Sequence, residues 1–161
     1  MAPGVSIANR YRGLRVPAPA LRRLFAVLAE ARGELAAGAP SAGTARELSV
    51  AFLSDTDLAR LHGRFLQDPT PTDVITFPPP PESESGGEIC VSVDAARRIA
   101  GARGFSRELT LYLVHGWLHL AGHDDLEPGK KRRMRRAERR ALAALASAGA
   151  MPRFTLAPFR R

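Results

Sequence analysis

Residues 115 to 125 read His-Gly-Trp-Leu-His-Leu-Ala-Gly-His-Asp-Asp, and they carry the strongest chemical signal in the chain. His115 and His119 are four residues apart, so on an α-helix their side chains lie on one face and can aim two imidazoles at one point. The neighbouring residues are apolar on nearly every side, which predicts a buried helix from about Arg107, capped by Ser106. A metal ion would satisfy both buried imidazoles, and an ordinary hydrogen-bonded core pair is the alternative.

The third metal ligand must come from beyond the end of this helix. On an unbroken helix His123 would lie about 12 Å from His115 along the axis, too far for two metal bonds of about 2 Å. Gly122 can take the left-handed conformation that ends a helix, after which either His123 or Asp125 can turn back. We favour Asp125, because histidines at i and i+4, a glycine at i+7 and a ligand at i+10 form the framework of the extended zinc-protease signature. Those proteases carry a glutamate general base where this chain has Gly116, which argues against peptide hydrolysis.

Such a site predicts one Zn²⁺ ion per chain and a catalytic role for a metal-bound water. Three protein ligands leave a fourth position open, and zinc lowers the pKa of a water bound there toward neutrality. Asp125 adds a negative charge to the metal, so we expect that water to be less acidic and harder metals to compete better with zinc.

Length and composition indicate one domain of 161 residues with 45% hydrophobic residues. No apolar run approaches the roughly eighteen residues of a membrane span, and the first residues lack a signal-peptide core. Cys90 is the single cysteine, which excludes an internal disulfide and favours the reducing cytoplasm. We predict a domain over residues 1–148 and a basic, proline-containing flexible tail over 149–161.

The formal net charge is +8, and most of it is local. Residues 130 to 140 hold eight cations and one anion, a net charge of +7. The cations of this segment are Lys130, Lys131, Arg132, Arg133, Arg135, Arg136, Arg139 and Arg140. A polyanion is the predicted partner, and a merely solvated helix face is the alternative.

The remaining pattern predicts an α/β (α+β) fold in a single domain, with a small mixed sheet of about four strands packed by about five helices. The helix that carries the two histidines should be central and buried. Alternating apolar residues predict strands over residues 5–8, 47–53, 73–77 and 89–93. Helical spacing predicts helices over about 19–32, 55–67, 94–102, 107–121 and 128–148, with Asp94 capping the third and Gly104 separating it from the fourth.

Three stretches resemble the YbeY endoribonucleases, also called rRNA maturation factors. The first is the metal motif, the second ends in Pro-Thr-Asp-Val-Ile-Thr-Phe-Pro, and the third is Gly-Glu-Ile-Cys-Val-Ser-Val. The metal motif consists of His115, His119, Gly122 and position 125. The second stretch covers residues 47–78, and the third covers residues 87–93. Together they span about residues 45–145.

The resemblance implies a zinc-dependent hydrolase that cuts single-stranded RNA in small-subunit rRNA maturation and ribosome quality control. It implies rRNA, the small ribosomal subunit and assembly factors as partners, whereas no membrane and no DNA is expected. Arginines are expected to hold the RNA backbone, and Arg97, Arg98 and the cations of residues 130–140 are the candidates.

This chain departs from the family pattern at two positions. The third ligand is usually histidine, and here it is Asp125. An arginine implicated in RNA cleavage usually follows the aromatic residue of the second block, but Leu66 follows Phe65, and Arg64 is the candidate to serve instead.

Two other functions compete with an endoribonuclease. A non-catalytic ribosome assembly factor would hold a purely structural metal, and a closed site with both His123 and Asp125 bound would favour it. A metallohydrolase of small molecules or peptides is the other rival, against which Gly116 and the basic segment argue.

Overall fold

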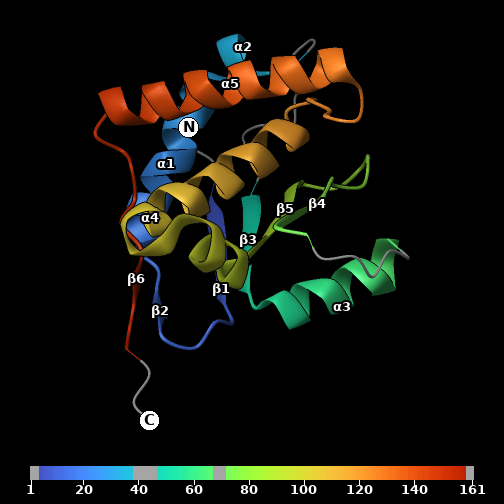
Figure 1. Ribbon diagram of the computed structural model, residues 1–161. Coiled ribbons are helices and arrows are strands. Elements are labelled where there is room, and N and C mark those ends of the chain that lie inside the picture. Colours follow the sequence, from blue (N-terminus) through green and yellow to red (C-terminus); the bar gives the residue numbers. More distant parts are fainter. Residues whose placement is uncertain (1–3, 38–46, 67–71, 159–161) are drawn as a thin grey trace.

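A mixed four-stranded sheet forms the middle of the molecule (Figure 1). The structure is a computed structural model that describes residues 4–37, 47–66 and 72–158. The strands lie in the order β1-β3-β5-β4. Strands β1, β3 and β5 are parallel, and β4 is antiparallel to β5. Their bounds are Val5–Asn9 for β1, Glu47–Leu53 for β3, Val74–Phe77 for β4 and Ser85–Ser92 for β5.

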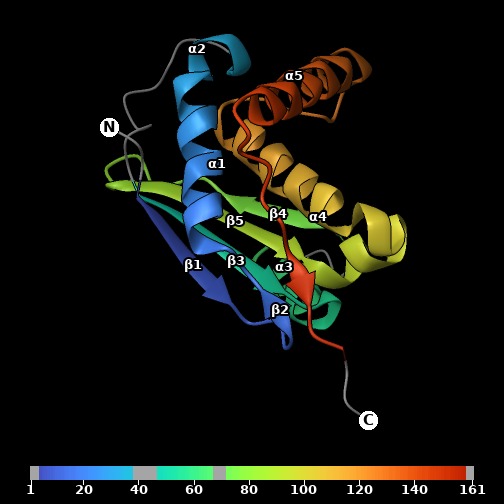
Figure 2. The ribbon, with the colours of Figure 1, turned by 90° about the vertical axis from the view of Figure 1, so that its left-hand side faces the viewer.

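The helices divide between the two faces of this sheet. In Figure 2, α1 and α4 cover one face, α5 lies outside α4, and α3 lies on the other side. The bounds are Ala18–Glu30 for α1, Arg32–Leu35 for α2, Asp55–Leu66 for α3, Val93–Leu120 for α4 and Pro128–Ser147 for α5. The predicted single α/β domain with a small mixed sheet, and its central, buried histidine helix, are therefore confirmed.

Strand β5 shows how the sequence places side chains on the two faces. Successive residues of a strand point to opposite faces. Ile89 and Val91 are fully buried in the larger core, beneath α1 and α4. Cys90 lies between them in sequence and belongs to the smaller core beside Leu58 of α3. The part of α4 that packs on Ile89 therefore lies on the sheet face opposite α3.

Helix α4 is continuous, and the predicted break at Gly104 is wrong. The helix runs 28 residues from Val93, with Ser92 rather than Asp94 as its cap: Ser92 Oγ accepts from Ala95 N at 3.0 Å. A glycine inside a helix costs only about 1 kcal/mol relative to alanine, and the buried residues that follow Gly104, Phe105 and Leu109 among them, outweigh that cost. Ser106 is likewise not a cap but lies inside this helix.

The segment from Gly149 packs on the domain, which corrects the predicted flexible tail for residues 149–158. Its strand Thr155–Leu156 (β6) pairs antiparallel with Leu14–Arg15 (β2). Phe154 is 3% exposed, and its backbone N–H donates to Ser106 Oγ at 2.9 Å. The Ser106 hydroxyl in turn donates to Phe154 O at 3.1 Å. The mid-helix serine thus anchors this segment.

None of the described helices is both long enough and apolar enough to cross a membrane.

Candidate metal centre

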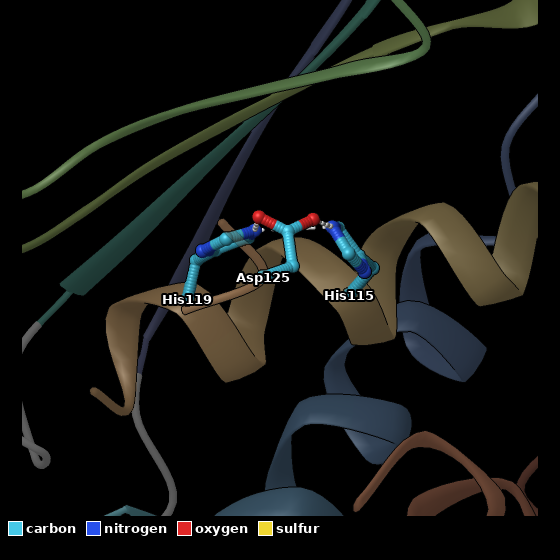
Figure 3. A group of neighbouring side chains, drawn as sticks. All are labelled: His115, His119 and Asp125. Carbon is cyan, nitrogen blue, oxygen red and sulfur yellow. Dashed lines mark hydrogen bonds and ion pairs between the residues drawn. The ribbon is translucent and has the colours of Figure 1, made fainter. Parts of the chain in front are cut away.

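Three side chains meet at the C-terminal end of α4: His115, His119 and Asp125. The two histidine Nε2 atoms are 3.0 Å apart. One carboxylate oxygen of Asp125 lies 3.4 Å from His115 Nε2, and the other lies 3.7 Å from His119 Nε2. Figure 3 shows the Asp125 carboxylate between the two imidazoles, with one oxygen directed at each. The spacing of four residues on the helix and ten to the carboxylate therefore brings the predicted trio together.

Gly122 makes the return of Asp125 possible, as predicted. It has φ +100°, which favours glycine, and a Cβ there would lie 2.6 Å from Ala37 O. The N–H of Gly122 donates to His119 O at 3.1 Å and the N–H of His123 donates to Leu118 O at 3.0 Å. These bonds reverse the chain directly after α4 and satisfy carbonyls at its end.

The imidazole of His115 is oriented by a carboxylate from the next helix. Its Nδ1 donates to Glu138 Oε1 at 2.5 Å, which leaves the Nε2 lone pair for a ligand. Burial alone would lower the pKa of His115, but the hydrogen bond to Glu138 and the charges of Glu138 and Asp125 outweigh it and raise that pKa. Glu138 thus fixes both the tautomer and the angle of the ring.

The imidazole of His119 is oriented by backbone instead. Its Nδ1 donates to His123 O at 3.1 Å, so its Nε2 also presents a bare lone pair. Burial and the neighbouring His115 lower the pKa of His119. The two histidines therefore differ in their affinity for a proton, although both present Nε2 to the same point.

The donor set fits a zinc-type metal ion. Two Nε2 lone pairs that face each other at 3.0 Å repel unless a metal ion or a proton lies between them. Tetrahedral geometry with bonds of about 2.0–2.1 Å separates ligand atoms by roughly 3.3 Å. The distance of 3.0 Å between the two Nε2 atoms and those of 3.4 and 3.7 Å from them to the two Asp125 oxygens bracket that value. Two nitrogens and one carboxylate are also a ligand set that catalytic zinc accepts.

His123, the alternative third ligand, points elsewhere. Its Nε2 bonds to Leu35 O at 2.6 Å, and its contribution to the centre is the backbone carbonyl that holds His119. Among the residues that the structure describes, the possible metal-binding group contains Asp125 and not His123. This arrangement favours the third ligand that the sequence analysis preferred.

Arg64 does not share the metal centre's side of the sheet. It lines a groove between α3 and the sheet together with Arg10, Arg60 and Cys90. Cys90 belongs to the α3 face, whereas Gly116 of the metal-site helix packs on the opposite face, where its Cβ would meet Ile89. Arg64 therefore lies on the other side of the sheet from the metal centre, and its catalytic role stays a prediction.

Arg97 and Arg98 also lie far from the metal centre, at the start of α4. Arg97 donates to the Tyr11 hydroxyl at 2.8 Å, and Arg98 forms an ion pair with Asp55. With a rise of 1.5 Å per residue, Arg98 lies about 25 Å from His115 along the helix. Their contacts tie the first turn of α4 to neighbouring elements.

The cations of residues 130–140 are all exposed on α5. The helix buries the predicted apolar stripe against the rest of the domain; its members are Met134, Ala137, Ala141 and Leu145. Lys130 approaches Asp124 at 3.7 Å and Glu127 at 3.9 Å. The basic surface therefore begins beside the loop that carries Asp125.

Glu138 is the residue of the centre that sequence reasoning missed. Two signals pointed to it: it is the one anion among the eight cations of its segment, and it lies four residues after the buried Met134. A charged residue on the inward face of a helix needs a buried partner. His115, on another element, is that partner.

Comparison with known proteins shows which family this chain resembles in sequence. Residues 7–146 match the family described as Endoribonuclease YbeY. A relative from Rhodopirellula baltica, "Endoribonuclease YbeY", is 35% identical over 130 residues, which cover 74% of this chain and 67% of the relative. A relative of the same name from Protochlamydia amoebophila is 36% identical over 108 residues, which cover 63% of this chain and 72% of the relative.

The fold has a counterpart in a solved structure. The solution structure of TM1509 from Thermotoga maritima superimposes with a TM-score of 0.51 at 22% identity, covering 98% of this chain and 99% of the other. The family match spans both the metal motif and the sheet that supports it, so this chain belongs to the YbeY endoribonuclease family.

Proposed function

We propose that this protein is a zinc-dependent endoribonuclease that hydrolyses phosphodiester bonds of single-stranded RNA, with one Zn²⁺ per chain. The observation that carries the proposal is the meeting of two Nε2 lone pairs and the Asp125 carboxylate at one point. Membership of an endoribonuclease family and the exposed cations of α5 support RNA as the substrate.

Each residue of the centre has a separate task in this proposal. His115, His119 and Asp125 hold the ion, which when bound polarises a phosphate oxygen and acidifies a water. Glu138 and the carbonyl of His123 keep the two imidazoles in the tautomer that binds metal. The cations of α5 attract the phosphate backbone and hold it beside the centre.

Asp125 bears on which metal is bound. A carboxylate is a harder ligand than an imidazole and brings a negative charge. We therefore expect Mn²⁺ to compete with Zn²⁺ better here than at a site with three histidines.

The wider role rests on the family resemblance. We infer that the substrate is rRNA during small-subunit maturation and ribosome quality control, that the partners are the small subunit and its assembly factors, and that the protein acts in the cytoplasm. A strongly basic helix suits a partner that is itself largely RNA.

Metal content and RNA cleavage, measured on the same preparations, test the proposal. Asp125→Ala should lose metal and cleavage together, whereas Asp124→Ala, which alters the neighbouring acid that faces Lys130, should keep both. His123→Ala should keep the metal, because its ring contacts Leu35 and not the centre. If His123→Ala lost the metal and the wild type cut no RNA, a closed structural site would be indicated and the assembly-factor function would replace this one.

A further inference from the structure

The contact between His115 and Glu138 sets the register of two antiparallel helices. Figure 1 shows α5 running back over α4 from the end that bears the metal centre. His115 is level with Glu138, because their side chains bond at 2.5 Å. His119 lies one turn further along α4, so it is level with the residues one turn earlier on α5, about 134 and 135. The metal centre is therefore bordered by the turns of α5 that precede Glu138.

One row of side chains on α5 runs from Glu138 toward the start of that helix, beside the metal centre. Side chains at i, i+4 and i+7 share a helix face, and Lys131, Arg135 and Glu138 have that spacing. Both cations are exposed, and no ion pair involves either of them within the residues that the structure describes. Lys130, by contrast, lies within 4 Å of two acidic side chains. Two uncompensated cations therefore lie on the helix face that reaches the metal ligands.

Other cations of α5 point away from the centre. At 100° per residue, Arg136 and Arg140 lie about 160° from Glu138 around the helix. Around the helix, Arg136 lies about 145° and Arg140 about 105° from the middle of the buried stripe of Met134, Ala137, Ala141 and Leu145. Both are exposed. Arg136 and Arg140 thus supply the same charge as Lys131 and Arg135 but lie on the side of α5 that faces away from Glu138.

We propose that Lys131 and Arg135 form a phosphate subsite that positions the reacting phosphate of RNA at the metal centre, whereas Arg136 and Arg140 only attract the polyanion. This inference rests on the proposed function and divides the basic helix into two kinds of contact. A guanidinium can hold two phosphate oxygens at once, which fixes orientation as well as position. A long-range charge on the far face raises the local concentration of RNA but does not orient it.

Two double variants with the same loss of charge test the division. Lys131→Ala with Arg135→Ala should lower kcat for a single-stranded RNA oligonucleotide by tenfold or more, because misplacing the reacting group is costly to the chemical step. Arg136→Ala with Arg140→Ala should raise KM severalfold and change kcat by less than twofold. Both should weaken the dependence of KM on salt, because each removes two positive charges that attract the phosphate backbone. Equal effects of the two variants on kcat would overturn the subsite.

A second measurement needs no RNA cleavage. Co²⁺ can replace zinc as a coloured probe, and inorganic phosphate is titrated while the visible spectrum of the metal is followed. The midpoint should rise about tenfold in the Lys131 and Arg135 variant and stay within twofold of wild type in the Arg136 and Arg140 variant. The subsite is also overturned if wild type gives no spectral response to phosphate. If the phosphate result is as expected but wild-type protein cuts no RNA, the proposed function fails and the subsite remains.

Discussion

The imidazole of His115 and the carboxylate of Glu138 form the shortest link between the metal centre and the basic helix, with Nδ1 2.5 Å from Oε1. We expect Glu138→Gln to weaken zinc binding by roughly 10–100-fold, because a carboxylate partner orients the ring and raises its basicity as a ligand. Competition with a chromophoric chelator measures this affinity. Glu127→Gln is the matched control, since Glu127 is exposed and its carboxylate lies 3.9 Å from Lys130 Nζ. Equal zinc affinity of wild type and Glu138→Gln would contradict the assignment.

Asp125→His should shift metal preference toward zinc. The substitution replaces a charged oxygen ligand by a neutral, softer nitrogen at the third position. Dialysis against equal concentrations of Zn²⁺ and Mn²⁺, followed by metal analysis, gives the ratio bound. We expect a higher zinc fraction in the variant than in wild type. An unchanged ratio would show that Asp125 does not contact the metal.

Gly122→Ala should destabilise the protein by about 1–3 kcal/mol, because a non-glycine residue is strained at positive φ. The added Cβ would also lie 2.6 Å from Ala37 O. A cost of that size lowers the Tm by several degrees in a chain of this length. Gly129→Ala is the control, because its Cβ would meet only a side-chain atom of Arg132 at 3.9 Å. A Tm for Gly122→Ala equal to that of the control would contradict the described helix end.

Cys90 should react with a thiol reagent only when the protein unfolds. It is 1% exposed, and burial together with the charge of Glu88 raises the pKa of its thiol to about 12. The reactive thiolate is therefore scarce and inaccessible at pH 8. Labelling by an aromatic disulfide reagent should be slow in buffer and complete in denaturant. Fast stoichiometric labelling of the native protein would be inconsistent with this packing.

Phe154→Ala should cost about 3–5 kcal/mol, as truncation of a buried aromatic residue usually does. Its ring is 3% exposed and lies 5.6 Å, centroid to centroid, from that of Phe52. Thr155→Ala, at an exposed position of β6, is the control. Urea unfolding measures both. If Phe154→Ala unfolded at the wild-type urea concentration, the segment after Gly149 would not belong to the core.

Sequence periodicity predicted the helices and strands that bury apolar residues at regular intervals. The alternation from Glu47 to Leu53 matches β3 residue for residue, and the return of the chain after Gly122 follows from the φ of that glycine. The break predicted at Gly104 is absent because a local propensity of about 1 kcal/mol is smaller than the stabilisation that α4 gains by packing on the sheet. The two-residue strands β2 and β6 are too short to show an alternating apolar pattern in the sequence. Their pairing also joins residues that are distant in sequence.

Glu138 shows what the sequence alone could not predict about the candidate site. The four-residue and ten-residue spacings indicated which side chains of one segment can converge. No spacing relates His115 to a residue of the following helix, because that contact depends on how α4 and α5 pack.

The pairing of β2 with β6 has a consequence for the order of folding. It joins residues near the two ends of the described chain, so it closes a loop that contains almost every other element. Closing so long a loop costs chain entropy that two short strands repay poorly until the intervening core has formed. We therefore expect this small sheet to assemble last and to open first. Hydrogen exchange at Ala157, whose N–H donates to Gly13 O across this pair at 2.8 Å, should then be faster than exchange in β3 and β5.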